Sequence, residues 1–126
     1  AYTYNSEGKP EKRTLDSGES TVFAYDAEGR RVREENYDET GELDGYRTTE
    51  YGDGYQRYNH YDADGTLRGY EVNIGNEQGK RARYELYNAD GTLTSYGIDV
   101  YDEDGNRIAW EHYDADGNLT GRDVYN

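Results

Sequence analysis

The chain has 126 residues, a formal net charge of −14 at pH 7 and no Cys. Binding to nucleic acid or to an anionic membrane surface needs clustered Lys and Arg, which this acidic composition excludes. No apolar run approaches the ~20 residues of a membrane-spanning helix, and the lack of Cys excludes disulfides and thiolate metal sites. Six Leu, three Ile, five Val and one Phe are few for a folded domain, but 16 Tyr recur in a regular pattern, which favours a folded chain over a disordered one.

Turn signals follow one another along the whole chain. Each ends at a glycine, and these glycines are Gly8, Gly18, Gly29, Gly41, Gly54, Gly65, Gly79, Gly91, Gly105 and Gly117. Their close and regular spacing leaves room for one short strand between each two turns, and no segment has helical periodicity. The sequence therefore predicts an all-β protein. We expect an antiparallel meander of about ten to eleven short strands, built from tandem hairpins in an extended or coiled sheet.

Two similar segments open the chain. Tyr2-Thr3-Tyr4-Asn5-Ser6-Glu7-Gly8 aligns without gaps with Phe23-Ala24-Tyr25-Asp26-Ala27-Glu28-Gly29, which Arg30 follows. Their Tyr-x-Tyr-Asp-x-x-Gly-Arg layout resembles the YD-repeat (Rhs) family, and the Tyr-Asp-x-x-Gly signature continues through the rest of the chain. The resemblance implies long β-sheets that spiral into shells or rods on secreted proteins, with no catalytic residues in the repeats.

A longer repeat begins at Tyr37. Its first unit spans residues 37–60, the second spans 61–86, the third spans 87–112, and a fourth begins at Tyr113. Each unit opens with a Tyr-flanked turn, and the complete units contain a second turn about halfway along. We therefore predict that residues 1–126 form a single β-hairpin repeat array, either complete or a segment of a longer one.

The Asp-x-Asp-Gly turns predict a strand register. The first Asp accepts a hydrogen bond from the backbone two residues on, and Gly takes the left-handed conformation of a type I turn with a G1 bulge. With Tyr61 opposite Leu67, this register predicts a ladder of three pairs: Tyr58 with Tyr70, Tyr84 with Tyr96, and Trp110 with Arg122. The ladder face is the predicted core. The rings either stabilise the sheet by cross-strand stacking or form a platform for sugar rings.

Acidic turns provide weak candidates for calcium binding. These are Asp62, Asp64, Asp102, Asp104, Asp114 and Asp116. Turn formation already accounts for their carboxylates, because the longer calcium-binding loop with its distal Glu is absent. His60 and His112 share a repeat position with Leu86, which favours a packing role for both. No nucleophile lies in a recognisable catalytic motif, so we expect no enzyme, no catalytic residue and no cofactor.

The chain's two outermost strands, which have a neighbour on one side alone, lead to a hypothesis about function. Unpaired N–H and C=O groups at a sheet edge recruit another chain. We therefore expect an extracellular or cell-surface structural protein, whose edge strands join other copies into a filament or shell. The alternatives are a carbohydrate-binding module, which presents open tyrosine faces, and an acidic immunity or antitoxin module for a basic toxin.

Overall fold

The computed structural model describes residues 1–125, and every element in this range is a β-strand. The strands are β1 (Tyr2–Tyr4), β2 (Pro10–Thr14), β3 (Ser20–Tyr25), β4 (Arg31–Tyr37), β5 (Leu43–Gly52), β6 (Tyr55–Asp62), β7 (Leu67–Gly75), β8 (Arg81–Asn88), β9 (Leu93–Tyr101), β10 (Arg107–Asp114) and β11 (Leu119–Val124). They form an open antiparallel sheet in sequence order, which confirms the predicted all-β meander. Within residues 1–125 no helix is long and apolar enough to cross a membrane.

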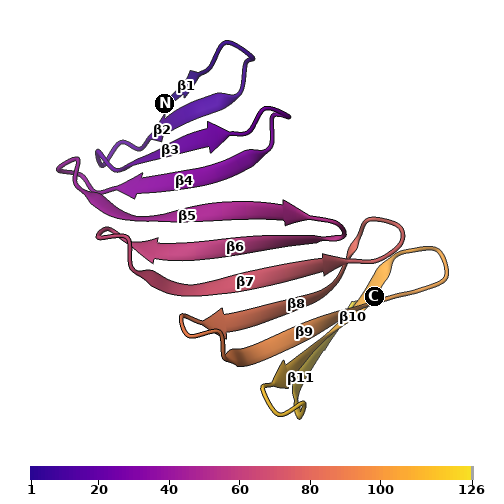
Figure 1. The fold of residues 1–126 in the computed structure, drawn as a ribbon. Coiled ribbons are helices and arrows are strands. Elements are labelled where there is room, and N and C mark those ends of the chain that lie inside the picture. Colours follow the sequence, from indigo (N-terminus) through magenta and orange to yellow (C-terminus); the bar gives the residue numbers. More distant parts are fainter. Residues whose placement is uncertain (126) are drawn as a thin grey trace. The chain divides into compact units, whose positions relative to one another are not determined.

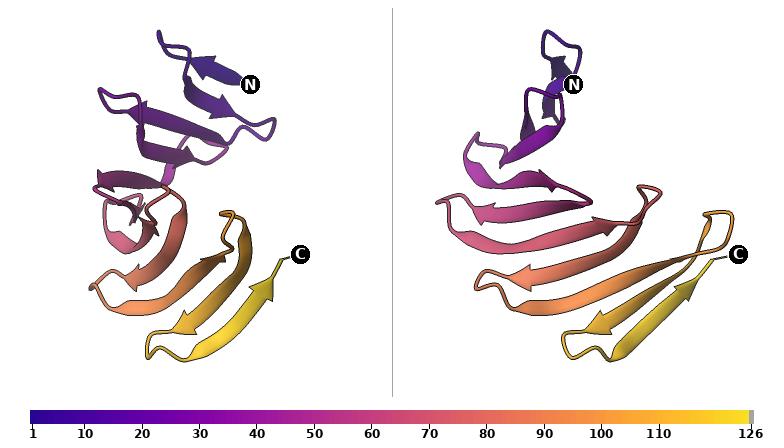
Figure 2. Two further views of the ribbon diagram at one scale, coloured as in Figure 1. Left: turned by 90° about the vertical axis from the view of Figure 1, so that its right-hand side faces the viewer. Right: turned by 45° about the vertical axis from the view of Figure 1, so that its right-hand side comes forward.

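The chain divides into two compact units. Unit 1 contains Ala1–Glu50 and Tyr58–Arg68, and unit 2 contains Tyr51–Arg57 and the residues from Gly69 onward. Within each unit, successive strands are joined by tight turns and lie beside one another (Figures 1 and 2). The prediction of a single array over residues 1–126 stays a prediction, and Asn126 lies outside the described residues.

The ten predicted turn glycines all adopt positive φ, between 78° and 98°. The turn after β10 illustrates the local chemistry. The Gly117 N–H donates to the Asp114 carbonyl at 3.1 Å, while Asp114 Oδ1 accepts the N–H groups of Asp116 and Asn118 at 3.0 and 2.9 Å. An Asp side chain and a left-handed Gly thus close the turn together, as the sequence predicts.

The register beyond the turn differs from the prediction by one residue. In the β8–β9 hairpin Tyr87 pairs with Leu93 as predicted, but Leu86 then faces Ser95. Thr94 is the extra residue of a β-bulge. A shift of one residue exchanges the faces of all the side chains that follow it, so the pairing farther from the turn changes as well.

Two predicted ladder pairs are therefore wrong. The observed pairs are Tyr84 with Gly97, Glu85 with Tyr96, Trp110 with Asp123, and Glu111 with Arg122. The bulge at Thr120 in the β10–β11 hairpin causes the second change in the same way. Tyr58 belongs to unit 1 and Tyr70 to unit 2, so their pairing stays a prediction.

The bulges also divide the predicted core between the two faces of unit 2. One face carries Tyr70, Val72, Tyr87, Tyr96, Ile98, Val100 and Tyr113, and the other carries Tyr84, Leu86, Ser95 and Trp110. Among the described residues, the buried hydrophobic side chains are those of Phe23 and Ala109. Contacts between neighbouring strands, rather than a large apolar interior, therefore hold the sheet together.

The turn aspartates make the fold sensitive to acid. Hydrogen bonds from backbone N–H groups lower the pKa of the Asp26 and Asp114 carboxyls. The largest cause is the N–H of Arg30 for Asp26 and the N–H of Asn118 for Asp114. Their stabilising effect is therefore present above the unfolded pKa of about 3.9 and is lost as pH falls through the lower folded pKa. We expect the urea concentration at the midpoint of unfolding to decrease as the pH is lowered through that acidic range.

Asparagine offers a matched control for the acid sensitivity. Asn5 and Asn76 accept the same pair of backbone N–H groups with a neutral amide oxygen. The double variant Asp26→Asn/Asp114→Asn should keep its turns at pH 7 and lose part of the acid sensitivity. Urea midpoints at a series of pH values measure this, and an unchanged pH profile would exclude the turn carboxyls as its source.

Candidate functional site: aromatic stacks and the Asp99 cluster

A three-layer stack of Arg, Tyr and Tyr occurs three times in the part of the chain that the structure describes. The Arg–Tyr–Tyr stacks are Arg33–Tyr46–Tyr61 in unit 1, and Arg57–Tyr70–Tyr87 and Arg83–Tyr96–Tyr113 in unit 2. In this order the guanidinium carbon lies 4.1, 3.7 and 4.1 Å from the centre of the middle ring. The two rings are 4.8, 4.7 and 4.9 Å apart and nearly parallel. Cation–π contact and ring stacking thus combine at each site.

The middle tyrosine of each stack also contacts a turn. A Cβ on Gly117 would lie 3.4 Å from the Tyr96 hydroxyl, and Gly65 and Gly91 have the same relation to Tyr46 and Tyr70. The tyrosine hydroxyl thus lies at ordinary contact distance, 3.4–3.6 Å, from the place of a Cβ. The positive φ is the feature that favours glycine at this position.

Carboxylates next to the stacks hold the outer tyrosines. The Tyr87 hydroxyl donates to Glu85 at 2.8 Å, and Arg83 forms an ion pair with the same carboxylate at 2.9 Å. Burial, with the hydrogen bond to Glu85, raises the pKa of the Tyr87 hydroxyl. The phenol therefore stays neutral at ordinary pH and remains a hydrogen-bond donor.

The predicted ladder residues fall into three groups. Tyr70 and Tyr96 are middle rings of Arg–Tyr–Tyr stacks, but their partners lie on the strand after them. Tyr84 contacts Trp110 with ring centres 5.4 Å apart. In the third group, Arg122 lies 3.5 Å from the Glu111 carboxylate, and Tyr58 lies under the Arg47 guanidinium at 5.0 Å.

Replacing a middle ring tests the stack. We expect Tyr96→Leu to lower the free energy of unfolding by about 1–2 kcal/mol, because it removes ring stacking and a cation–π contact while keeping an apolar side chain. Urea denaturation measures the loss. Tyr55→Leu is the control, because the Tyr55 side chain is 45% exposed. Equal losses in the two variants would contradict a stabilising role for the stack.

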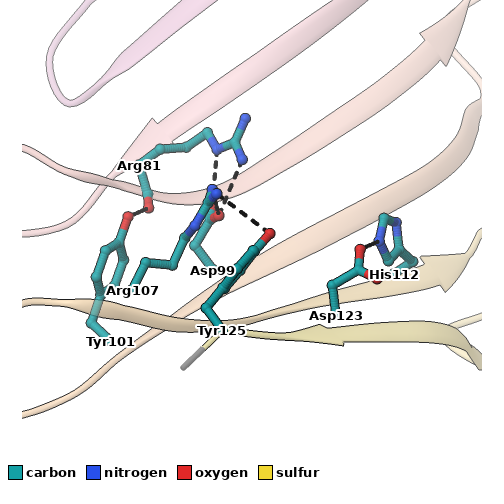
Figure 3. Close-up of polar contacts among 7 residues, drawn as sticks. All are labelled: Arg81, Asp99, Tyr101, Arg107, His112, Asp123 and Tyr125. Carbon is teal, nitrogen blue, oxygen red and sulfur yellow. Dashed lines mark hydrogen bonds and ion pairs between the residues drawn. The ribbon is translucent and has the colours of Figure 1, made fainter.

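Asp99 is the centre of an ion-pair cluster in unit 2 (Figure 3). Its side chain has 0% exposure, and its two oxygens lie 2.8 Å from Arg81 Nε and 3.1 Å from Arg107 Nη1. Arg81 comes from β8 and Arg107 from β10, so one carboxylate on β9 connects three strands. The hydrogen bond to Asp99 is the largest cause of the raised pKa of Arg81.

Aromatic rings cover a glycine on the same face. A Cβ on Gly97 would lie 2.1 Å from Tyr84 Cε1 and 2.8 Å from Trp110 Nε1, so the two rings occupy the space of the missing side chain. The His112 ring meets the Trp110 ring edge-on at 3.4 Å between centres and lies 3.3 Å from the Asp123 carboxylate. Rings that cover the backbone of a strand glycine stabilise a sheet.

The register predicted from the Asp-x-Asp-Gly turns also sets Arg81 opposite Asp99, and this ion pair is present. The sequence interpretation did not find the second partner, Arg107, or the rings that cover Gly97. Asp99 and Gly97 stand where the preceding repeat unit has Asn73 and Glu71. The informative signal was the departure from the repeat, and not the repeat itself.

Four of the six calcium candidates contact their own turns through the carboxylate. Asp102 Oδ1 accepts two backbone N–H groups at 2.9 Å, Asp64 Oδ1 accepts one at 3.0 Å, and Asp62 lies 3.3 Å from Arg68. Among residues 1–125, no group of three His, Cys, Asp or Glu side chains is arranged to hold a metal ion. The carboxylates of Asp62, Asp64, Asp102 and Asp114 thus have an observed structural role, and the calcium interpretation gains no support.

Comparison with known proteins identifies the fold class alone. No family model matches the chain, and no curated protein sequence matches it. Among solved structures, the crystal structure of TcdB2-TccC3-TEV matches with a TM-score of 0.57 and 14% identity, over 99% of this chain and 6% of that chain. The chain therefore spans a small part of that protein. A mutant of S. aureus TarM matches with a TM-score of 0.36 and 18% identity, over 82% of this chain and 19% of that one, which is too low to carry an argument.

Proposed function

We propose that this chain is a structural repeat segment at the outside of the cell, whose sheet is continued by further copies into a filament or shell. The observation that carries the proposal is the outer edge of β11. Among the described residues no strand lies beside this edge, and Leu119 and Val124 are 55% and 64% exposed. Exposed apolar side chains on an unpaired strand favour the addition of another strand.

The repeat supplies a second argument for the β11 edge. Gly69 in β7 corresponds to Gly121 in β11, and a Cβ on Gly69 would lie 2.7 Å from the Tyr87 carbonyl of the next strand. At Gly121 the nearest atom outside its chain neighbours is His112 Cδ2, at 3.8 Å. β11 thus carries the glycine that accompanies this close approach in β5 and β7, whereas β9 pairs with β10 with Ser95 at the same position.

The stack geometry disfavours the carbohydrate-binding alternative. Sugar recognition needs a free aromatic face, but the middle tyrosine of each stack has an Arg on one face and a Tyr on the other. No observation on the described residues favours the immunity or antitoxin alternative. The cell-surface location rests on the YD-repeat resemblance, and catalysis is not part of the proposal.

Light scattering over a wide concentration series tests assembly. We expect the mass to rise above the 14.5 kDa of the monomer with concentration. Val124→Lys should reduce the rise, because a charge on an edge strand opposes pairing. Leu15→Lys, in the turn between β2 and β3, is the control, because Leu15 is also exposed, at 46%. A monomer at every concentration would refute the proposal.

A second test addresses location. Protease added to intact cells should remove the chain if it lies outside, while a cytoplasmic marker survives. Protection of the chain in intact cells, together with cleavage after lysis, would refute the extracellular location.

A further inference from the structure

At least six hairpins of the described residues close with one common geometry. The last Tyr of the first strand pairs with the residue two positions after the turn glycine, and the next pair skips one residue on the second strand. After the odd-numbered strands β1, β3 and β9 these pairs are Tyr4–Pro10 then Thr3–Lys12, Tyr25–Arg31 then Ala24–Arg33, and Tyr101–Arg107 then Val100–Ala109. The hairpins after β4, β8 and β10 pair in the same way, so the pattern belongs to a strand that ends in a turn-opening Tyr.

β11 has the sequence of another such strand. It continues into Val124-Tyr125 followed in sequence by Asn126, as β1 continues through Thr3-Tyr4 into Asn5. β11 has six residues and β1 has three. Tyr2 and Tyr4 of β1 are 50% and 59% exposed, so β1 buries little surface on β2. β2 itself has five residues and Ala1 already exchanges hydrogen bonds with Thr14, so the exchange gains side-chain contacts and not a longer backbone ladder.

Charge complementarity points to the same exchange. With β11 in the place of β1, Tyr125 lies opposite Pro10, Val124 opposite Lys12 and Asp123 opposite Arg13. Arg13 faces Tyr2 within its own chain, and its Nε is buried without a hydrogen-bond partner among residues 1–125. The Asp123 side chain is 60% exposed. The exchange therefore brings a carboxylate opposite an unpaired guanidinium nitrogen, and opposite charges on facing strands attract.

We propose that copies of this chain join head to tail by strand exchange, with β11 of one copy occupying the place of β1 on the β2 edge of the next. The inference rests on the proposed function and specifies its junction. Each junction stays antiparallel. β1, β3 and β9 each use one edge to pair antiparallel with the next strand in the chain, and β11 uses the same edge to pair with β2 of the next copy. The alternative is simple addition, in which an intact β1 of the next copy lies directly beside β11. β1 and β11 are both odd-numbered strands of an antiparallel meander and have the same direction, so this pair is parallel when the two copies have the same orientation.

Cross-linking tests the register of the junction. The chain has no Cys, so two introduced thiols are the only ones present. Val124→Cys on one copy and Lys12→Cys on another should form a disulfide-linked dimer under mild oxidation, visible on a non-reducing gel. Val124→Cys mixed with Thr3→Cys is the matched control and should give at least several-fold less dimer. Equal yields in the two mixtures would overturn the exchange.

Charge reversal tests the same junction without cross-linking. Asp123→Arg alone and Arg13→Asp alone should each reduce the assembled fraction several-fold, and the double variant, which carries both changes on every chain, should restore it. Glu103→Arg, in a turn away from both edges, is the control. Assembly that persists with neither the disulfide nor charge rescue would overturn the exchange and leave the proposed function standing. A monomer throughout would overturn both.

Discussion

Replacing Asp99 by Asn lowers the free energy of unfolding by about 2 kcal/mol, the result we expect from loss of the ion-pair cluster. Removing one partner of a buried pair costs about 3–5 kcal/mol because a charge is left uncompensated. Here the groups left behind are Arg81 and Arg107, with side chains 38% and 41% exposed, so water solvates them in part and the loss is smaller. Urea denaturation in dilute solution gives the value.

Asp123→Asn provides the matched control for this prediction. Asp99 and Asp123 face Trp110 from its two sides, on β9 and β11. The Asp123 side chain is 60% exposed and contacts His112, so its replacement should change stability by less than about 0.5 kcal/mol. If Asp123→Asn lowered the free energy of unfolding as much as Asp99→Asn, the effect would come from the charges around Trp110 in general and not from the buried cluster.

The turns were predictable from the sequence because their chemistry is local. An Asp or Asn that accepts backbone N–H groups and a glycine that takes positive φ lie close together in the chain, as between Asp114 and Asn118. Nothing from the rest of the chain is needed to form them. The number of strands and their antiparallel order followed directly from the turns.

The register was not predictable from the same signals. The skipped residue stands three positions after the turn glycine in each of the bulged hairpins, and the skipped residues are Glu11, Val32, Asp44, Ala82, Thr94, Ile108 and Thr120. They share no side-chain chemistry and none is a glycine, so the residue type does not mark the bulge, although its distance from the turn is constant. Because of the bulge, Tyr96 faces Glu85 in the β8–β9 hairpin and stacks on Tyr113 in the β9–β10 hairpin.

The aromatic stacks were partly visible in the sequence. Tyr70 and Tyr87 recur with the same separation as Tyr96 and Tyr113 in successive units. This separation pairs strands across the second turn of the unit, whereas the predicted ladder considered pairs across the Asp-x-Asp-Gly turn alone. Tyr70 and Tyr96 take part in ring contacts, but the hairpin that joins each of them to its partner is not the one that the predicted ladder used.

Gly97→Ala should lower the free energy of unfolding by about 2–3 kcal/mol, because the added methyl group overlaps two rings. Its Cβ would lie 2.1 Å from Tyr84 Cε1 and 2.8 Å from Trp110 Nε1. The rings are in contact with each other, and Trp110 also meets His112, so neither moves without disturbing the other. Overpacking of this kind costs about 1–3 kcal/mol, and the loss of the backbone cover adds to it.

Gly52→Ala separates ring overlap from the general effect of replacing a strand glycine. A Cβ on Gly52 would also lie 2.1 Å from a ring carbon, that of Tyr55, but Tyr55 is 45% exposed and has room to rotate into solvent. Its variant should therefore stay within about 1 kcal/mol of the parent chain, since Ala costs less backbone entropy than Gly. Trp110 is the single Trp, so its fluorescence should shift in Gly97→Ala and remain unchanged in Gly52→Ala. Unchanged fluorescence together with unchanged stability in Gly97→Ala would contradict the ring cover over Gly97, because that cover leaves no space for a methyl group without movement of the indole.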